Sequence, residues 1–223
     1  MMRWFFFCCY NLLMKKIKIL LIIVGATIFS FFVWSIIFVS LMPDHEVLKL
    51  EKPEFSEMRI VEKFEYYDIY GSTEHELREE MYRNGPYDPS SLETFFAFTD
   101  FSDVKMKDAG VDIKCGPYVP DTVEVTYVLP NWVNKEDGDK FLNDKWNKFI
   151  KKLTEHEKEH GQIGIESFRD MENIIYETPV TNNCIAYHLR ILNLVSEEAE
   201  KNKVKQIEFD RITDHGQDRG ASF

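Results

Sequence analysis

Two histidines, His156 and His160, lie four residues apart in the segment LTEHEKEHG. Residues at this spacing lie above one another on a helix, so both imidazoles can bind one metal ion. Glu157 completes an H-E-x-x-H pattern, in which the glutamate takes a proton from a water activated by zinc. The same letters also fit H-x-x-E-H, in which Glu159 is the base. The spacing alone does not choose between the two glutamates.

A long helical pattern begins near Gly138 and must position these histidines. Its apolar and functional residues recur every three or four positions, at Leu142, Trp146, Phe149, Leu153, His156, His160, Ile163, Met171 and Ile174. At about 100° per residue, both histidines continue the apolar stripe, and Lys158 lies on the opposite side. Two buried imidazoles without an ion would each need a separate polar partner. We therefore predict that this face binds a divalent metal.

A catalytic zinc site also needs a third protein ligand and an open position. Glu166 follows His156 by ten residues, and a glycine turn at Gly164 would bring it back to the metal. On a regular helix, Glu166 instead points away from the histidines.

The remaining histidines offer other candidates for the third ligand. His188 lies in a later helical pattern, one residue off its apolar stripe. His215 lies in a C-terminal segment that can fold back towards the helix. His45 and His75 have acidic or polar surroundings and are expected in solvent.

The other elements indicate an α+β domain. Four segments are rich in β-branched and aromatic residues and predict strands: 59–71, 94–101, a weak one around 111–115, and 121–130. Thr73 and Glu76 form a capping box that opens a short helix, which ends at 84–86. A second long helix is expected at 185–208, with one face formed by Leu189, Leu192, Val195 and Ala199. A polar tail closes the chain.

The segment from Ile19 to Met42 contains 24 residues and no charge. A helix of this length reaches roughly 36 Å, enough to cross a hydrocarbon core about 30 Å thick. Lysines precede the segment and acidic residues come after it, so we expect the N-terminus in the cytoplasm and the domain outside. A cleaved signal peptide is the competing interpretation, but its apolar region would be shorter and would end in small residues.

The charge of the chain is divided unevenly. Residues 1–42 hold four basic residues and no acidic one, and the whole chain has a net charge of −11, so residues 43–223 carry −15. Phosphate backbones repel a domain this acidic, and no basic stripe offsets the charge. We therefore expect no nucleic-acid partner.

Cysteines fall on both sides of the proposed membrane span. Cys8 and Cys9 lie in the cytoplasmic segment, where thiols stay reduced. Cys115 and Cys184 lie in the exported domain, where only one intrachain pairing is available to them. We expect a disulfide between these two residues.

Five segments in a fixed order resemble a bacterial family catalogued as domain of unknown function 922 and described as predicted secreted zinc-dependent proteases. They are YYDIYGSTEHELREEMYRNGP, FTDFSDVKM, VLPNW, WNKFIKKLTEHEKEHG and FDRITDHGQDRGA, and they span most of residues 64–223. The chain departs from the family pattern at Phe101 and Met106, where tryptophans are usual, and at Phe209, where tyrosine is usual. The two cysteines of the domain also fall where the family has its pair.

The resemblance implies roles for several residues. The family keeps glutamate at the second position of the histidine motif, which favours Glu157 as the base. Its closing motif matches Asp210, Thr213, His215 and Gly216, which favours His215 as the third zinc ligand. Asp210, Glu166 and His188 remain the alternatives for that ligand.

Together these observations predict a zincin-like α+β domain in residues 57–223, preceded by a cytoplasmic tail (1–18), a transmembrane anchor (19–42) and a spacer (43–56). The expected function is hydrolysis of peptide bonds, with Zn²⁺ held by His156, His160 and His215. It is expected outside the cytoplasm, in the periplasm or the extracellular space. The alternative is a non-catalytic module, in which zinc with four protein ligands stabilises a domain that binds envelope partners. An amidase acting on cell-wall peptide is disfavoured by the acidic surface.

Overall fold

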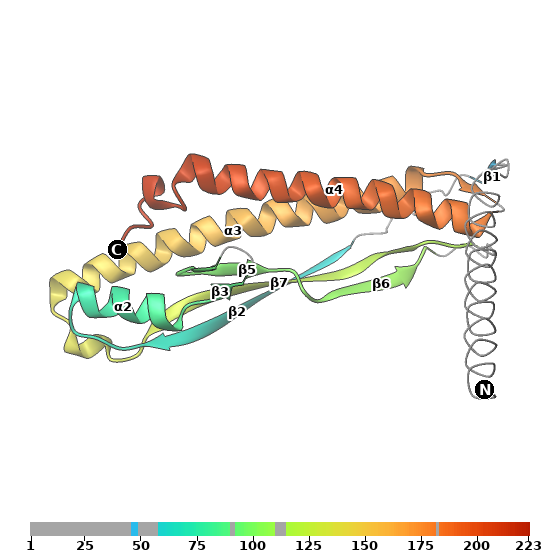
Figure 1. The fold of residues 1–223 in the computed structure, drawn as a ribbon. Coiled ribbons are helices and arrows are strands. Elements are labelled where there is room, and N and C mark those ends of the chain that lie inside the picture. The colour runs from blue at the N-terminus through green and yellow to red at the C-terminus, as the bar shows by residue number, and fades with distance from the viewer. Residues whose placement is uncertain (1–45, 49–57, 90–91, 110–114, 182) are drawn as a thin grey trace, which may run out of the picture.

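The computed structural model describes residues 46–48, 58–89, 92–109, 115–181 and 183–223 (Figure 1). The predicted cytoplasmic tail and transmembrane anchor, and most of the spacer, lie outside these residues, as does most of the weak strand expected around 111–115. Within the described part of the chain, none of the helices combines the length and the hydropathy needed to cross a bilayer.

A four-stranded sheet is built around one long central strand, β7 (Tyr118–Trp132). β2 (Arg59–Ile69) pairs with it in parallel along its whole length, from Arg59 opposite Thr122 to Ile69 opposite Trp132. On the other side, β5 (Phe98–Asp100) and β6 (Val104–Asp108) pair with β7 in antiparallel orientation, one after the other. β7 supplies most of the buried residues of the sheet, Val119, Val123, Val125, Tyr127 and Leu129.

Two long helices cover one face of this sheet, α3 (Lys140–Glu177) and α4 (Cys184–Thr213). Figure 1 shows them running side by side, with α3 between the sheet and α4. The side chain of Asp139 caps the start of α3 by accepting a hydrogen bond from the backbone of Leu142. The predicted apolar stripe of α3 is buried at Leu142, Trp146, Phe149 and Leu153.

Short elements close both ends of the molecule. At one end, β8 (Val180–Thr181) joins the two long helices and pairs with β1 (Glu46–Leu48), and the predicted disulfide Cys115–Cys184 is confirmed, with 5.0 Å between its Cα atoms. At the other end, α2 (Glu74–Asn84) begins at the predicted cap Thr73 and packs Leu77 and Met81 against the aromatic residues of α3.

Several expected boundaries differ from the structure. The run 94–101 is not one strand: β4 (Glu93–Thr94), which pairs with β3 (Tyr87–Asp88), and β5 are separated by a segment whose Ala97 enters the core. β6 was not predicted, because charged residues interrupt its sequence, VKMKD. α4 continues beyond Glu208 to Thr213, so the expected tail begins five residues later. Two 3₁₀ turns, η1 (Lys135–Asp137) and η2 (Gln217–Arg219), lie before α3 and after α4.

Candidate metal centre

The middle of α3 carries both histidines of the motif on its buried side, facing α4. The side chain of His156 is 4 % exposed and that of His160 is 12 % exposed. One turn further on, Gly161 and Gly164 lie against Tyr127 and Phe101, and a Cβ atom at either glycine would collide with these rings. The glycines therefore let the sheet pack closely against α3 directly beside the histidines.

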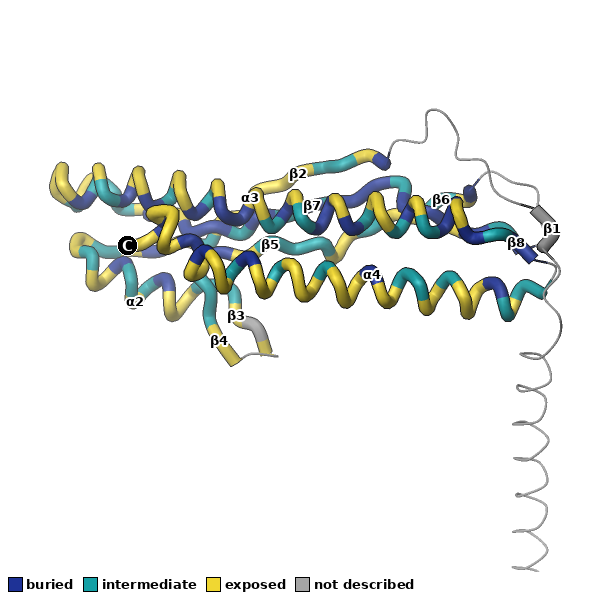
Figure 2. The backbone as a smooth tube through the Cα atoms, turned by 90° about the horizontal axis from the view of Figure 1, so that it is seen from above, coloured by how far each residue is buried: buried dark blue, intermediate teal, exposed yellow. Residues whose placement is uncertain are grey.

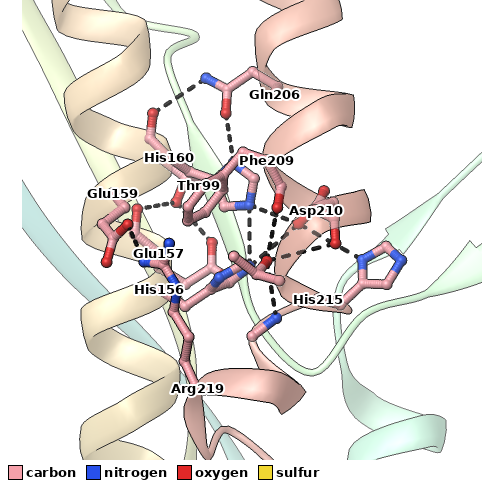
Figure 3. Close-up of polar contacts among 12 residues, drawn as sticks. Thr99, His156, Glu157, Glu159, His160, Gln206, Phe209, Asp210, His215 and Arg219 are labelled. Atoms are coloured by element: carbon pink, nitrogen blue, oxygen red, sulfur yellow. Dashed lines mark hydrogen bonds and ion pairs between the residues drawn. The ribbon is translucent and has the colours of Figure 1, made fainter.

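Three ligand atoms converge between α3 and α4 (Figure 3). Nε2 of His156 and Nε2 of His160 lie 3.1 Å apart, and Oδ1 of Asp210 lies 3.2 Å from the first and 2.9 Å from the second. A tetrahedral zinc site with bonds of about 2.0 Å has ligand atoms about 3.3 Å apart. The three atoms therefore have nearly the spacing of one face of such a tetrahedron, and among the described residues they form the group that could hold a metal ion.

Hydrogen bonds alone do not satisfy this triangle. Each Nε2 atom carries at most one proton, and the carboxylate oxygen of Asp210 carries none when ionised. At most two of the three atom pairs can then share a proton in a hydrogen bond. The two atoms of the third pair face each other without a proton between them. A cation at the centre would instead accept a lone pair from all three atoms, so the donor set fits a divalent metal.

Residues of α4 orient the two imidazoles. Oε1 of Gln206 lies 2.5 Å from Nδ1 of His160, and its Nε2 donates to the backbone carbonyl of the same histidine at 3.1 Å. With Nδ1–H donating to Gln206, the Nε2 lone pair of His160 points to the centre. The ring of Phe209 stacks on His156, with centroids 4.9 Å apart, and meets His160 edge-on at 4.8 Å.

The turn after α4 closes the back of the site. Asp214, His215 and Gly216 are consecutive residues with positive φ, at 48°, 51° and 81°. A Cβ atom at Gly216 would lie 3.0 Å from Cγ of His156, so glycine suits both the left-handed backbone and the close approach. Strained backbone of this kind commonly occurs at functional sites.

The two glutamates of the motif have different surroundings, which the spacing could not predict. Glu157 is 6 % exposed, and the hydroxyl of Thr99 lies 2.7 Å from its Oε2. Burial raises the pKa of the Glu157 carboxyl, and the hydrogen bond from Thr99 offsets part of this rise. Glu159 instead points outwards and forms an ion pair with Arg219. Of these two glutamates, only Glu157 is therefore buried beside the histidines.

His215, the expected third ligand, lies beside the cluster and does not complete it. Its side chain is 61 % exposed, and its Nδ1 lies 3.6 Å from Oδ1 of Asp210, on the side away from His156 (Figure 3). The third convergent atom comes from Asp210, which the sequence offered only as an alternative.

The other candidate ligands lie elsewhere. α3 continues as a regular helix through Gly164, so the turn that would return Glu166 to the histidines does not form; Glu166 is exposed and pairs with Gln162. His188 is exposed near the opposite end of α4, and His75 is exposed on α2. His45 lies outside the described residues.

Charges in the cluster stabilise one another. Burial by itself raises the pKa of Asp210, but hydrogen bonds from His156 and His160 outweigh it and hold that pKa well below its usual value. Burial by itself lowers the pKa of His160, yet the hydrogen bonds with Asp210 and Gln206 leave it above the usual value of 6.5. The contact between Asp210 and the imidazoles therefore favours the charged form of each partner relative to the same group in water.

A cleft of about 790 Å³ opens onto the cluster. Its walls come from the segment Glu93–Thr99, from α2 and from the C-terminal residues, and Glu157 and the three convergent residues border it. Many of its side chains are aromatic, including Tyr82, Phe95, Phe96, Phe98 and Phe101. The cluster can therefore be reached by a molecule much larger than water.

Sequence reasoning missed Thr99 and Gln206. One signal for Gln206 existed: Gln206 and Asp210 are four residues apart on α4, as His156 and His160 are on α3, so antiparallel helices can match the two pairs. No pattern in the sequence marked Thr99, which comes from a different element.

A family model described as "Bacterial protein of unknown function (DUF922)" matches residues 64–216, which is more than half of the chain. Comparisons with curated proteins and with solved structures find no match. The matched segment contains Thr99, the histidine motif, Asp210 and both disulfide cysteines, and it confirms the resemblance drawn from the sequence. The chain belongs to the bacterial family of unknown function DUF922.

Proposed function

We propose that this chain is a membrane-anchored, zinc-dependent peptidase whose zincin-like domain lies outside the cytoplasm. One observation carries the proposal: His156, His160 and Asp210 present three ligand atoms at tetrahedral spacing, next to the buried carboxyl group of Glu157. Three protein ligands with an open position are typical of catalytic zinc sites.

Zinc is the metal that this donor set fits best, because two imidazoles and one carboxylate at these distances match its ligand preferences. When bound, zinc supplies Lewis acidity that lowers the pKa of a water molecule and polarises the substrate carbonyl. Glu157 accepts a proton from the attacking water as its oxygen bonds to the carbonyl carbon, and delivers that proton to the amine nitrogen as the C–N bond breaks. Burial supports this role, because it makes Glu157 a stronger base than an exposed glutamate.

The cleft supports a peptide as the substrate. β5 borders it and pairs only with β7 among the described strands, so no described strand covers the other edge of β5. An extended peptide can add to such an edge through main-chain hydrogen bonds. The aromatic walls provide surfaces for apolar side chains of that peptide.

Two observations support a location outside the cytoplasm. The disulfide Cys115–Cys184 is of a kind that persists in oxidising compartments. The uncharged segment 19–42, with lysines before it and acidic residues after it, has the composition of an anchor that directs the C-terminal domain across the membrane.

A second candidate function rests on His215. If its imidazole joins His156, His160 and Asp210, the metal has four protein ligands and no open position, and the site is structural. This alternative is supported by the distance of 3.6 Å between Nδ1 of His215 and Oδ1 of Asp210.

The test is a comparison of full-length wild type with Glu157→Gln, measuring zinc content by elemental analysis and cleavage of a mixed peptide library by mass spectrometry. We expect both proteins to hold one zinc, and only the wild type to cleave. Loss of a general base typically costs about 10²–10⁴-fold in rate. Equal cleavage by both proteins, or zinc without any cleavage, would rule out the peptidase mechanism, and the second result would favour the structural site.

A further inference from the structure

The two halves of α4 have opposite character. The first half, Cys184–Val195, has the sequence CIAYHLRILNLV, with one formal charge, Arg190, and no acidic residue. The second half, Ser196–Thr213, contains nine charged residues among its 18 positions. The first half of α4 therefore differs from the acidic average of a domain that carries −15.

The first half of α4 is apolar on both of its sides. Its inner side packs Tyr187, Ile191 and Val195 against the core of the domain. Its outer side exposes Ile185, Leu189 and Leu192, at 60 %, 49 % and 59 % respectively. These three residues, at i, i+4 and i+7, lie in one line along the helix, which we call the α4 stripe. Figure 2 shows exposed stretches recurring along α4, whose first half lies next to β8. The polar residues His188, Arg190 and Asn193 are exposed beside this line, so the first half of α4 has one apolar strip towards solvent in addition to its packed side.

The fold holds the α4 stripe close to the proposed membrane anchor. β8 lies directly before α4, and its residues Thr181 and Val180 pair with Glu46 and Leu48 of β1. Glu46 is only four residues beyond Met42, where the uncharged segment ends. Since an extended chain spans at most about 3.6 Å per residue, Ile185 lies within roughly 35 Å of the end of that segment.

We propose that the α4 stripe docks on the lipid surface of the membrane in which the chain is anchored. This inference rests on the anchor of the proposed function, and it is independent of the peptidase chemistry. Anionic headgroups repel most of this acidic domain, but the first half of α4 has no acidic residue and carries Arg190. Ile185, Leu189 and Leu192 would enter the interface, as the apolar face of a surface-bound helix does.

A lipid surface fits the α4 stripe better than a second copy of the chain. A specific protein–protein interface uses about 20–30 residues on each side, and the stripe offers three large apolar ones. The short link to the anchor keeps the lipid surface within reach in every molecule, at a high effective concentration. Docking would also fix the orientation of the domain relative to the membrane. Asp210 lies about 37 Å from Ile185 along α4, so this orientation would set where the candidate metal site lies.

The experiment uses the full chain with Cys8→Ser and Cys9→Ser, reconstituted at one copy per lipid nanodisc. A nitroxide is attached at Leu189→Cys, after the native disulfide has formed, and in a matched control at Val204→Cys. Val204 is 58 % exposed in the charged half of the same helix. Electron paramagnetic resonance then measures collisions of each label with oxygen, which enters lipid, and with a water-soluble nickel chelate.

We expect the label at position 189 to collide with oxygen and to be protected from the chelate, and the label at 204 to show the reverse. Adding Leu192→Glu should abolish the protection at 189 and leave zinc content unchanged. Equal access of the chelate to both labels would overturn the proposal. If the label at 189 is protected in detergent and its spectrum shows dipolar broadening by a second label, the partner is a second copy of the chain. This result would also overturn the proposal. Failure of the chain to enter nanodiscs would refute the anchor as well, whereas peptidase activity is measured separately.

Discussion

At one end of the α3–α4 pair, an apolar cluster around Tyr187 joins the helices and a disulfide ties α4 to Cys115, just before β7; at the other end two histidines of α3 face Asp210 of α4. The first end is complete as it stands, because apolar burial and a covalent bond need no further ligand. The second end leaves three ligand atoms around a point that no proton arrangement fills. The same helix pair thus has a packed core at one end and a candidate metal site at the other.

The helical repeat explains how core residues and candidate ligands lie on one face of α3. Leu142, Trp146, Phe149 and Leu153 build an apolar core with the repeat that then places His156 and His160 on the same side. If the two ends are independent, a substitution at one end should leave the properties of the other unchanged.

The largest expected effect is on metal binding. Asp210→Ala removes one of the three convergent atoms, and we expect zinc affinity, measured by competition with a chromophoric chelator, to fall by more than about 100-fold. His215→Ala is the matched control, because the side chain lies beside the cluster and is mostly exposed. A larger loss in His215→Ala than in Asp210→Ala would assign the third ligand to the histidine.

The disulfide should contribute stability and leave the metal site unchanged. Its cysteines are 69 residues apart, so their replacement by Cys115→Ser with Cys184→Ser should lower the free energy of unfolding by about 4 kcal/mol. Urea denaturation measures this change, and zinc affinity should stay at the wild-type value. A fall of zinc affinity in the same variant would show that the two ends are coupled.

A smaller effect is expected at Gln206, which contacts His160 and lies outside the ligand triangle. Gln206→Ala should lower zinc affinity by about 10–100-fold, the range found for residues that orient a metal-bound histidine. Gln206→Glu should restore much of the affinity, because its carboxylate can accept the same proton from Nδ1. An unchanged affinity in the alanine variant would mean that packing by Phe209 alone orients the imidazole.

The smallest effect is a dependence on pH. In zinc-free protein, the raised pKa of His160 means that protonated His160 stabilises the fold below about pH 6.5, and this contribution is lost as the pH rises through the raised value. Zinc needs the neutral imidazole, so its affinity should rise over the same range. NMR titration of the zinc-free protein should place the His160 transition above 6.5, and Asp210→Asn should lower it; a transition at or below 6.5 in wild type would contradict the proposed ion pair.

Periodicity in the sequence predicted the elements that have strong internal patterns. The strand around 121–130, the capped helix after Thr73 and both long helices are present, because alternation and the helical repeat are local properties. The predicted end of α4 was wrong, since no glycine or proline stops a helix between Glu208 and Asp214, where the chain turns into the left-handed region.

Only the part of the candidate site that lies on one helix could be predicted from the sequence. His156, His160 and Glu157 share one helix, so their spacing is enough to bring them together. Asp210 and Thr99 reach them only because α4 and β5 pack against α3 in one register, which depends on tertiary contacts that the sequence does not state. The resemblance pointed to the C-terminal motif that contains Asp210 but favoured His215, five residues beyond the residue whose oxygen converges.

X-ray absorption spectroscopy of the zinc-loaded full-length protein tests the central claim most directly, because it counts the imidazoles bound to the metal. Our account predicts two imidazole nitrogens, the Asp210 oxygen and one solvent oxygen, all at about 2.0–2.2 Å. A zinc ion with three imidazoles, with four protein ligands and no solvent, or no stoichiometric zinc at all would contradict it.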